Sequence, residues 1–229
     1  MSYIDRSFLG TLERRHVANG LAEILKMALI RSSKLTDLLA THGRAMLDDS
    51  FSGTDPSLAS AMDAVISMSI QLMLEELQPN LWETNLERCV DFGHTFSPTI
   101  EMEALPEILH GEAVNIDMII SSVISFNRHL MDHHDLSKIL TVMRSLELPT
   151  WNSILENPKL LSLALADTQR HRGGQQRIPL PVGVGNHVFV NDVTEKEIAT
   201  AIALLKTLSQ AESDSFMSLL NPEYMGDRS

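Results

Sequence analysis

Three polar side chains in this sequence have the types that bind a catalytic metal ion. Glu23 interrupts an apolar helical pattern, His94 follows Gly93, and His110 precedes Gly111 at the start of a very apolar stretch. One carboxylate and two imidazoles form a usual catalytic zinc set, and three protein ligands leave a fourth position for water or substrate. A glycine beside each histidine would let the backbone come close to a bound ion.

Sharper zinc signatures are absent, and each of these residues alone also fits a structural role. The sequence has no HExxH motif. The run His110-Gly111-Glu112 copies the H-x-E of zinc deaminases, but those enzymes also need a P-C-x-x-C motif, and Cys89 is the only cysteine. A lone histidine is more often a satisfied core or capping residue than a ligand. Spacing does not decide whether the three residues meet in space.

Two charged residues lie close to this trio in sequence. Lys26 follows Glu23 by one helical turn, so both side chains project from one face of a helix. The pair fits an ion pair on a solvated face, or a cation for an anionic substrate beside the metal. Asp91 precedes His94 by three residues and could orient that imidazole or bind substrate.

Composition narrows the class of protein. The 229 residues are 44% hydrophobic, which allows a sizeable core, and 30 acidic against 18 basic residues give a net charge of −12. That charge argues against a free-standing nucleic-acid binder, in spite of the basic run at 170–177. The single Cys89 excludes an internal disulfide and fits a reducing compartment. No apolar run approaches the roughly 20 residues of a membrane span, and the N-terminus lacks a signal-peptide core. We expect a cytoplasmic protein without nucleic-acid or membrane partners.

Hydrophobic periodicity predicts a mainly helical chain that positions these residues. A capping box, Thr194 with Glu197, opens the last predicted helix. Prolines, glycines and a Val-Phe-Val run predict one small β-hairpin near 177–193. The sequence GVGN at 183–186 lacks the third glycine and the following helix of a dinucleotide fingerprint. We expect one domain over 1–208 and a loosely ordered tail over 209–229. The predicted helices cover 16–31, 34–47, 57–78, a segment from near Leu86, the segment after His110, 136–146, 157–168 and 195–208.

Three ordered motifs resemble the dehydroquinate synthase-like sugar phosphate cyclases. They are GLAEILK at 20–26, DFGHTF at 91–96 and LHGEAVNIDM at 109–118, and FLGTLERRHVANG at 8–20 resembles the segment that enters the metal-binding domain of those enzymes. The resemblance implies that one residue of each motif binds a catalytic Zn²⁺ or Co²⁺ ion, namely Glu23, His94 and His110. It also implies that Lys26 lies in the substrate site.

The details resemble the 2-epi-5-epi-valiolone synthase branch, which cyclises sedoheptulose 7-phosphate. Dehydroquinate synthases usually have asparagine and histidine where this chain has Asp91 and Pro98, and a lysine that the 68–78 stretch lacks. Asp91 and His171 also favour this branch over desmethyl-4-deoxygadusol synthase. The resemblance implies catalytic roles for Lys26, Asp91 and His171. It implies substrate-binding roles for Arg88, Asn115 and Arg172.

Members of this family carry an N-terminal NAD-binding domain, and nothing in these 229 residues resembles it. Because no side chain can take up a hydride, we expect the chain alone to be inactive as a cyclase. Three explanations stay open: a fragment of a longer protein, an NAD domain encoded separately, or a non-catalytic helical metal-binding module. A fragment of a dehydroquinate or desmethyl-4-deoxygadusol synthase and a helical metal hydrolase are further alternatives. The family also implies a homodimer for the full-length form.

Overall fold

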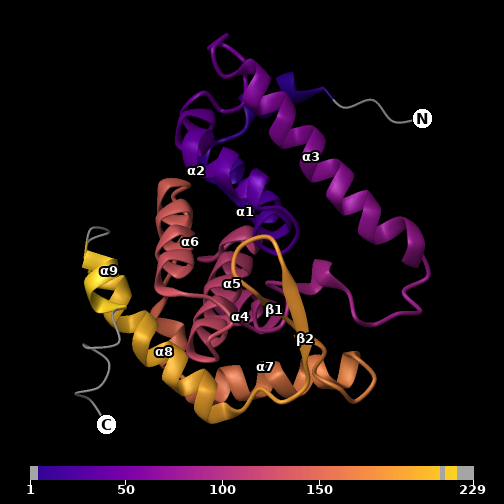
Figure 1. Cartoon of the computed structure of the whole chain (residues 1–229), viewed down its shortest axis with the longest axis vertical. Coiled ribbons are helices and arrows are strands. Elements are labelled where there is room, and N and C mark those ends of the chain that lie inside the picture. The colour runs from indigo at the N-terminus through magenta and orange to yellow at the C-terminus, as the bar shows by residue number, and fades with distance from the viewer. Residues whose placement is uncertain (1–4, 212–214, 221–229) are drawn as a thin grey trace.

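Helices make up most of the computed structural model, which describes residues 5–211 and 215–220 (Figure 1). The two strands of those described residues pair as one antiparallel hairpin, so the predicted mainly helical fold with one hairpin is confirmed. The α-helices and strands are α1 (Arg14–Arg31), α2 (Ser33–Asp48), α3 (Ala59–Leu77), α4 (Ser97–Ala104), α5 (His110–Asn127), α6 (His133–Ser145), α7 (Pro158–His171), β1 (Ile178–Pro181), β2 (His187–Val190), α8 (Glu195–Ser209) and α9 (Phe216–Leu219). Short 3₁₀ turns are η1 (Arg6–Thr11), η2 (Gln78–Asn80), η3 (Cys89–Asp91) and η4 (Ser153–Glu156).

Helix α5 lies at the centre of the fold (Figure 1). Its residues from Ala113 to Ser125 are all buried, because α1, α4, α6, α8 and β1 pack around it. A helix that is apolar on all sides is stable only inside a core. The packing of α1 on α5 brings two of the candidate residues towards each other, since Glu23 lies on the first helix and His110 begins the second.

The hairpin is fixed to the C-terminal end of α1. Its strands pair from Ile178 with Val190 to Pro181 with His187. At the tip, the Gly185 N–H donates to the Leu29 carbonyl at 2.7 Å. Gly185 has a positive φ, and a Cβ there would lie 2.5 Å from the backbone nitrogen of Ser33, the first residue of α2. The GVGN sequence is therefore a docked turn, as expected from its missing glycine, and not a phosphate loop.

The prediction that a helix begins near Leu86 is wrong. Residues 81–88 are irregular, η3 is a single 3₁₀ turn, and α4 begins only at Ser97. The Asn80 side chain holds a turn by donating to the Asn85 carbonyl and accepting from the Asn85 N–H. Gly93 then takes a left-handed conformation, with φ of 75°, which breaks any continuous helix. The chemistry of this segment thus lies on a loop.

The described part of the tail packs on the domain. Phe216 and Leu220 are fully buried, and the Arg144 guanidinium lies 4.3 Å from the centre of the Phe216 ring. Arg144 also donates to the carbonyls of Leu208 and Ala211. We expected a loosely ordered tail over 209–229; within that range, the described segment 215–220 contributes Phe216 and Leu220 to the buried core. The rest of the predicted tail, 212–214 and 221–229, lies outside the described residues.

The helices of the described ranges do not include a candidate membrane span. None of them combines the length and the apolar content that crossing a bilayer requires.

Candidate metal and substrate site

The structure brings Glu23, His94 and His110 together. One ligand atom from each lies within 4.8 Å of the others. The Glu23 Oε1 atom is 3.5 Å from His110 Nε2 and 4.0 Å from His94 Nε2. Helix α1 supplies the carboxylate, the first residue of α5 supplies one imidazole, and the loop before α4 supplies the other. Three segments that are distant in sequence therefore converge on one point.

The outer nitrogen of each imidazole is tied to the protein. His94 Nδ1 donates to the Phe92 carbonyl at 3.2 Å, and His110 Nδ1 lies 2.9 Å from a Glu101 carboxylate oxygen. A carbonyl or an ionised carboxylate can only accept, so each Nδ1 carries the proton. Each Nε2 then presents its lone pair towards Glu23. Metal-binding histidines are held in this way, with the second ring nitrogen donating to a carbonyl or carboxylate.

Lys26 completes the charge balance around Glu23. Its Nζ lies 2.7 Å from Glu23 Oε2, and its side chain is only 5% exposed, so the pair is not an ion pair on a solvated face. Burial would raise the pKa of Glu23, but the charge and hydrogen bond of Lys26 hold that pKa below its usual value. Burial, followed by the Lys26 charge, lowers the pKa of His94. Both groups are therefore in the ionisation states that bind a metal.

The three residues fit a metal ion because one of their oxygen atoms is buried without a hydrogen-bond donor. Glu23 Oε1 is buried and accepts no hydrogen bond within the described residues. Leaving a buried acceptor unpaired costs about 1–3 kcal/mol. The Nε2 atoms of His94 and His110, at 4.0 and 3.5 Å from Oε1, face it with lone pairs and therefore cannot donate a hydrogen bond to it. A cation that bonds to Oε1 and both Nε2 atoms would remove this cost, and the carboxylate–imidazole set suits Zn²⁺ or Co²⁺.

The glycines beside the two histidines serve helix packing. A Cβ on Gly111 would lie 2.4 Å from the Asn19 carbonyl oxygen of α1. A Cβ on Gly93 would lie 2.8 Å from Met118 and 2.9 Å from Val114, both on α5. We expected these glycines to let the backbone approach an ion. The structure gives them another reason, because they let α1, the His94 loop and α5 approach one another.

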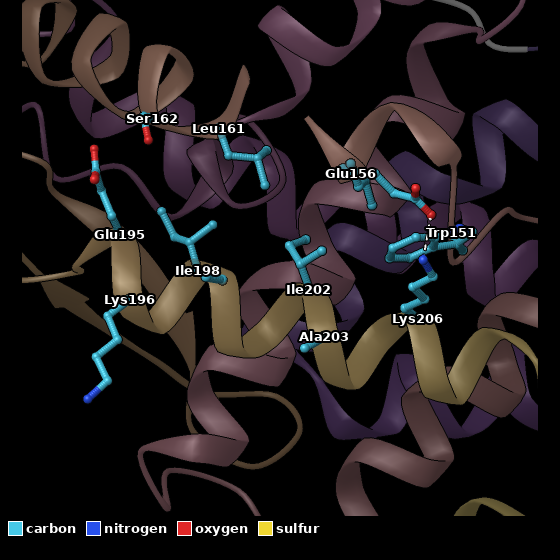
Figure 2. A pocket seen from close by; sticks show the side chains of 12 residues that line it. Trp151, Glu156, Leu161, Ser162, Glu195, Lys196, Ile198, Ile202, Ala203 and Lys206 are labelled. Atoms are coloured by element: carbon cyan, nitrogen blue, oxygen red, sulfur yellow. Dashed lines mark ion pairs between the residues drawn. The ribbon is translucent and has the colours of Figure 1, made fainter. Parts of the chain in front are cut away.

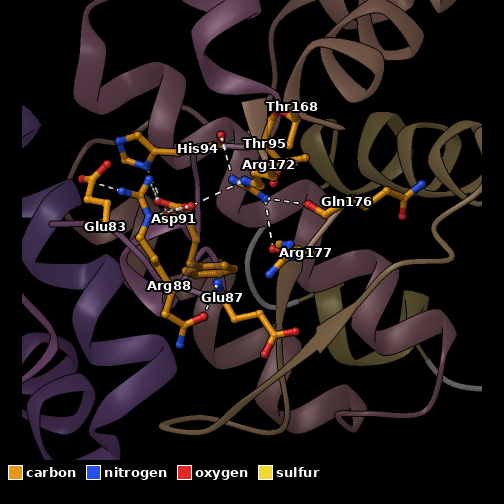
Figure 3. Close-up of polar contacts among 12 residues, drawn as sticks. Glu83, Glu87, Arg88, Asp91, His94, Thr95, Thr168, Arg172, Gln176 and Arg177 are labelled. Atoms are coloured by element: carbon orange, nitrogen blue, oxygen red, sulfur yellow. Dashed lines mark hydrogen bonds and ion pairs between the residues drawn. The ribbon is translucent and has the colours of Figure 1, made fainter. Parts of the chain in front are cut away.

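A polar cavity of about 600 Å³ opens beside His94. Figure 3 shows Arg88, Asp91 and Arg172 gathered there. Arg88 donates to both carboxylate oxygens of Asp91, at 2.7 and 3.2 Å. His171, the last residue of α7, is exposed and lines the same cavity. Five of the residues predicted for substrate chemistry or metal binding thus share one cavity wall: Arg88, Asp91, His94, His171 and Arg172.

Two of the residues predicted for substrate chemistry, Asn115 and Lys26, do not line this cavity. Asn115 is fully buried in α5, and its Nδ2 donates to the Pro149 carbonyl, so it does not face the cavity. Lys26 does not line the cavity, and its Nζ forms an ion pair with the Glu23 carboxylate. Cys89 is also buried, and burial raises the pKa of its thiol, which disfavours the thiolate.

Sequence reasoning missed two supporting carboxylates. Glu101, on α4, holds His110. Asp117, fully buried on α5, accepts the N–H groups of Phe96 and Ser97 and so caps the start of α4 behind His94. Asp117 lies inside the third motif, so its polarity in an apolar helix was a usable signal. Nothing in the spacing of Glu101 marked it.

A second cavity lies between α7 and α8 and differs in character (Figure 2). Its volume is about 500 Å³, and Leu155, Leu161, Ile198 and Ile202 are part of its mostly apolar lining. One ion pair, Glu156 with Lys206 at 2.8 Å, lies at its edge. The titratable groups around it do not form a metal-binding set, whereas those beside the first cavity do. The first cavity is therefore the candidate site.

Comparison with known proteins shows what this chain is similar to. The chain is 50% identical over 228 residues to a 2-epi-5-epi-valiolone synthase of Streptomyces albus. The aligned region covers 100% of this chain and 53% of that relative. It is 33% identical over 208 residues to a demethyl-4-deoxygadusol synthase of Trichormus variabilis, covering 90% of this chain and 50% of that protein. The chain thus spans about half the length of the curated relatives it matches.

A solved structure places the same fold in a larger enzyme. The 2-epi-5-epi-valiolone synthase of Streptomyces hygroscopicus subsp. jinggangensis 5008, solved with NAD⁺ and Zn²⁺ bound, matches 90% of this chain and 55% of its own, with 50% identity and a TM-score of 0.85. The family model described as 3-dehydroquinate synthase C-terminal matches residues 20–170. That range contains all three metal-site candidates. The chain therefore belongs to the 3-dehydroquinate synthase C-terminal family, and its similarity within the sugar phosphate cyclases is to the 2-epi-5-epi-valiolone synthases.

Proposed function

We propose that this chain is the metal- and substrate-binding half of a sugar phosphate cyclase. In this proposal the complete enzyme converts sedoheptulose 7-phosphate into 2-epi-5-epi-valiolone and releases phosphate. The observation that carries it is the convergence of Glu23, His94 and His110 beside a polar cavity, in a chain 50% identical to synthases of that name. The demethyl-4-deoxygadusol synthase relative is more distant, at 33% identity.

In this proposal Glu23 Oε1 and the two Nε2 atoms hold Zn²⁺ or Co²⁺. When bound there, the ion supplies Lewis-acid polarisation of a substrate oxygen. Lys26 keeps Glu23 ionised and adds positive charge next to the site, where it favours negative charge developing on the substrate. The Phe92 carbonyl and Glu101 keep both imidazoles in the tautomer that leaves Nε2 free.

The cavity side of the site would hold the sugar. Arg88 is partly exposed and can present a cation to an anionic substrate while it stays hydrogen-bonded to Asp91. The exposed imidazole of His171 can donate to or accept from a substrate hydroxyl. Asp91 offers an acceptor to a second hydroxyl. These three residues would select the sugar by its hydroxyl pattern.

The described residues do not form a dinucleotide site. The GVGN sequence ends in a hairpin tip bound to α1, and the alternating βαβ pattern of a nucleotide-binding fold is absent from residues 5–211. We therefore assign no redox step to this chain. We propose that the NAD-binding part of the enzyme is supplied from outside these 229 residues, by a longer form of the protein or by a partner.

A chimeric enzyme tests this function. The matching half of the Streptomyces albus synthase is replaced by this chain, and the product and phosphate are measured with sedoheptulose 7-phosphate and NAD⁺. We expect cyclase activity in the chimera, none in its His94→Ala form, and none in the isolated chain. An inactive chimera that is folded and metal-loaded would contradict the assignment. Phosphate release by the isolated chain without NAD⁺ would identify a hydrolase instead.

A further inference from the structure

Arg172 lies where α7 ends, and its side chain points into the protein. The side chain is only 8% exposed, whereas its neighbours Arg170 and His171 are exposed. Figure 3 shows the guanidinium between Asp91 on one side and the backbone of the following turn on the other. A buried guanidinium must be matched by acceptors, because unpaired buried donors are costly.

The acceptors of Arg172 are protein groups. Nη1 donates to the carbonyls of Gln176 and Arg177, at 3.0 and 3.1 Å. Nη2 donates to the carbonyl of His94 at 3.3 Å, and Nε forms an ion pair with Asp91 Oδ2 at 3.5 Å. A guanidinium has five N–H donors in a fixed planar fork. Most of them are already used, so little capacity remains for a two-pronged contact with a substrate phosphate.

The same loop is held by two further contacts. One turn earlier on α7, Thr168 Oγ1 donates to the Thr95 carbonyl at 2.7 Å. Asp117 on α5 accepts the Phe96 and Ser97 N–H groups. Thr168 on α7 and Arg172 directly after it therefore bind two consecutive carbonyls, those of Thr95 and His94, while α5 binds the N–H groups of the next two residues. The backbone around His94 is therefore held by hydrogen bonds from α5 and from the C-terminal end of α7.

We propose that Arg172 is a positioning residue that fixes the backbone of His94 and the carboxylate of Asp91 together. This inference rests on the proposed function, since it takes His94 as a metal ligand. One rigid, planar group sets the spacing between the metal-binding side of the site and its sugar-binding side. The role differs from the substrate contact that the family resemblance implies for this arginine. Groups that orient metal ligands act on metal affinity without touching the ion.

The test compares Arg172→Lys with Arg128→Lys in the 229-residue chain. Lysine keeps the charge, but its single ammonium cannot span the same acceptors. Arg128 is a matched control: it makes four hydrogen bonds, to Glu197 and Asp192, at the far end of α5. Zn²⁺ affinity is measured by chelator competition, and the Co²⁺ form is followed by its visible absorption. Hydrogen–deuterium exchange reports on residues 91–97.

We expect Arg172→Lys to weaken Zn²⁺ binding about 10- to 100-fold. The Co²⁺ spectrum should shift, and amides in 91–97 should exchange at least about tenfold faster. In Arg128→Lys, metal affinity and amide exchange in 91–97 should stay within about twofold of the unmodified chain. This should hold even if the two variants lose a similar amount of thermal stability, because Arg128 makes its hydrogen bonds far from His94 and Asp91.

Two results would overturn the proposal. Unchanged metal affinity and exchange in Arg172→Lys would return this arginine to a substrate-binding role. Equal changes in both variants would show a general effect of stability. If the unmodified chain binds no stoichiometric metal, the proposed function fails, and the exchange comparison alone then decides whether Arg172 fixes the loop.

Discussion

The two ends of helix α5 carry polar clusters of opposite character. At its start, His110 meets Glu23 and His94. At its end, the Arg128 guanidinium donates to both carboxylate oxygens of Glu197 and to Asp192. Both clusters join α5 to other segments through charged groups. Only the first leaves a buried acceptor without a donor.

This difference separates a cluster that has room for an ion from a cluster whose charges are satisfied by the protein. Glu197 also accepts from the Thr194 N–H and hydroxyl, so its oxygens are satisfied by the protein alone. Glu23 Oε1 faces two nitrogen lone pairs and gains nothing from either. We call the cluster of Glu23, His94 and His110 the open cluster, and the cluster of Arg128, Asp192 and Glu197 the closed cluster. The closed cluster contributes to stability without a ligand, whereas the open cluster is stabilised most when an ion binds. The comparison therefore predicts which substitutions change function and which change only stability.

The largest effect should come from removing the charge of Glu23. Glu23→Gln keeps the shape of the side chain but weakens the ligand and leaves Lys26 without its carboxylate partner. We expect Zn²⁺ affinity to fall about 100- to 1,000-fold, because apparent zinc binding energies of about 10–16 kcal/mol are shared among a few ligands. Metal content after dialysis and chelator competition measure this.

Glu197→Gln is the matched control at the other end of α5. It should lower the free energy of unfolding by about 1–2 kcal/mol, through weaker charge-assisted bonds to Arg128, and leave metal affinity unchanged. Full metal content in Glu23→Gln would remove this carboxylate from the ligand set. A loss of metal in Glu197→Gln would show that the two clusters are not independent.

An intermediate effect should follow from Gly111→Ala, which separates α1 from α5. The new Cβ would lie 2.4 and 2.7 Å from the carbonyl oxygen and Cα of Asn19, and backbone atoms cannot move aside cheaply. We expect a loss of about 3 kcal/mol in unfolding free energy, measured in denaturant. Metal affinity should fall about tenfold, since His110 moves away from Glu23.

Gly20→Ala is the control for that substitution. A Cβ on Gly20 would have no neighbour within 4 Å, and this residue is inside α1. Alanine is the better helix former by roughly 1 kcal/mol, so this variant should be slightly more stable and bind metal normally. Equal stability of Gly111→Ala and the unmodified chain would show that the two helices are not in close contact at this point.

The sequence predicted the open cluster because its members stand in three recognisable motifs. The helices and the Thr194–Glu197 capping box followed from periodicity and local spacing, which need no knowledge of the path of the chain. Residues 86–96 were predicted poorly. Their conformation depends on Gly93 and on contacts from α5 and α7, which distant segments supply.

The supporting residues were harder to predict for the same reason. Glu101 reaches His110 only because a short helix and a turn bring it back to the start of α5. The family resemblance implied that Arg172 is a cation that binds substrate. Its burial, and so its role, depends on which way the chain turns after α7, and sequence patterns do not give that direction.

The smallest predicted effect is a pH dependence of the closed cluster. The hydrogen bonds from Arg128, and then those from Thr194, lower the pKa of Glu197 to about 2 in the folded protein, from 4.5. The unfolded chain therefore takes up a proton at a higher pH than the folded one. The stability that Glu197 contributes is complete above pH 4.5 and is lost as the pH falls towards 2.

The difference in unfolding free energy between the unmodified chain and Glu197→Gln should therefore shrink between pH 4.5 and 2, because glutamine does not titrate. Denaturant unfolding of both proteins at pH 7, 4 and 3, without added metal, measures this difference. Metal is left out so that protonation of the open cluster does not add a binding effect. A difference that stays constant down to pH 3 would show that Glu197 stabilises α8 through its shape and capping contacts, and that its charge contributes nothing; the two ends of α5 would then differ in electrostatics as well as in hydrogen bonding.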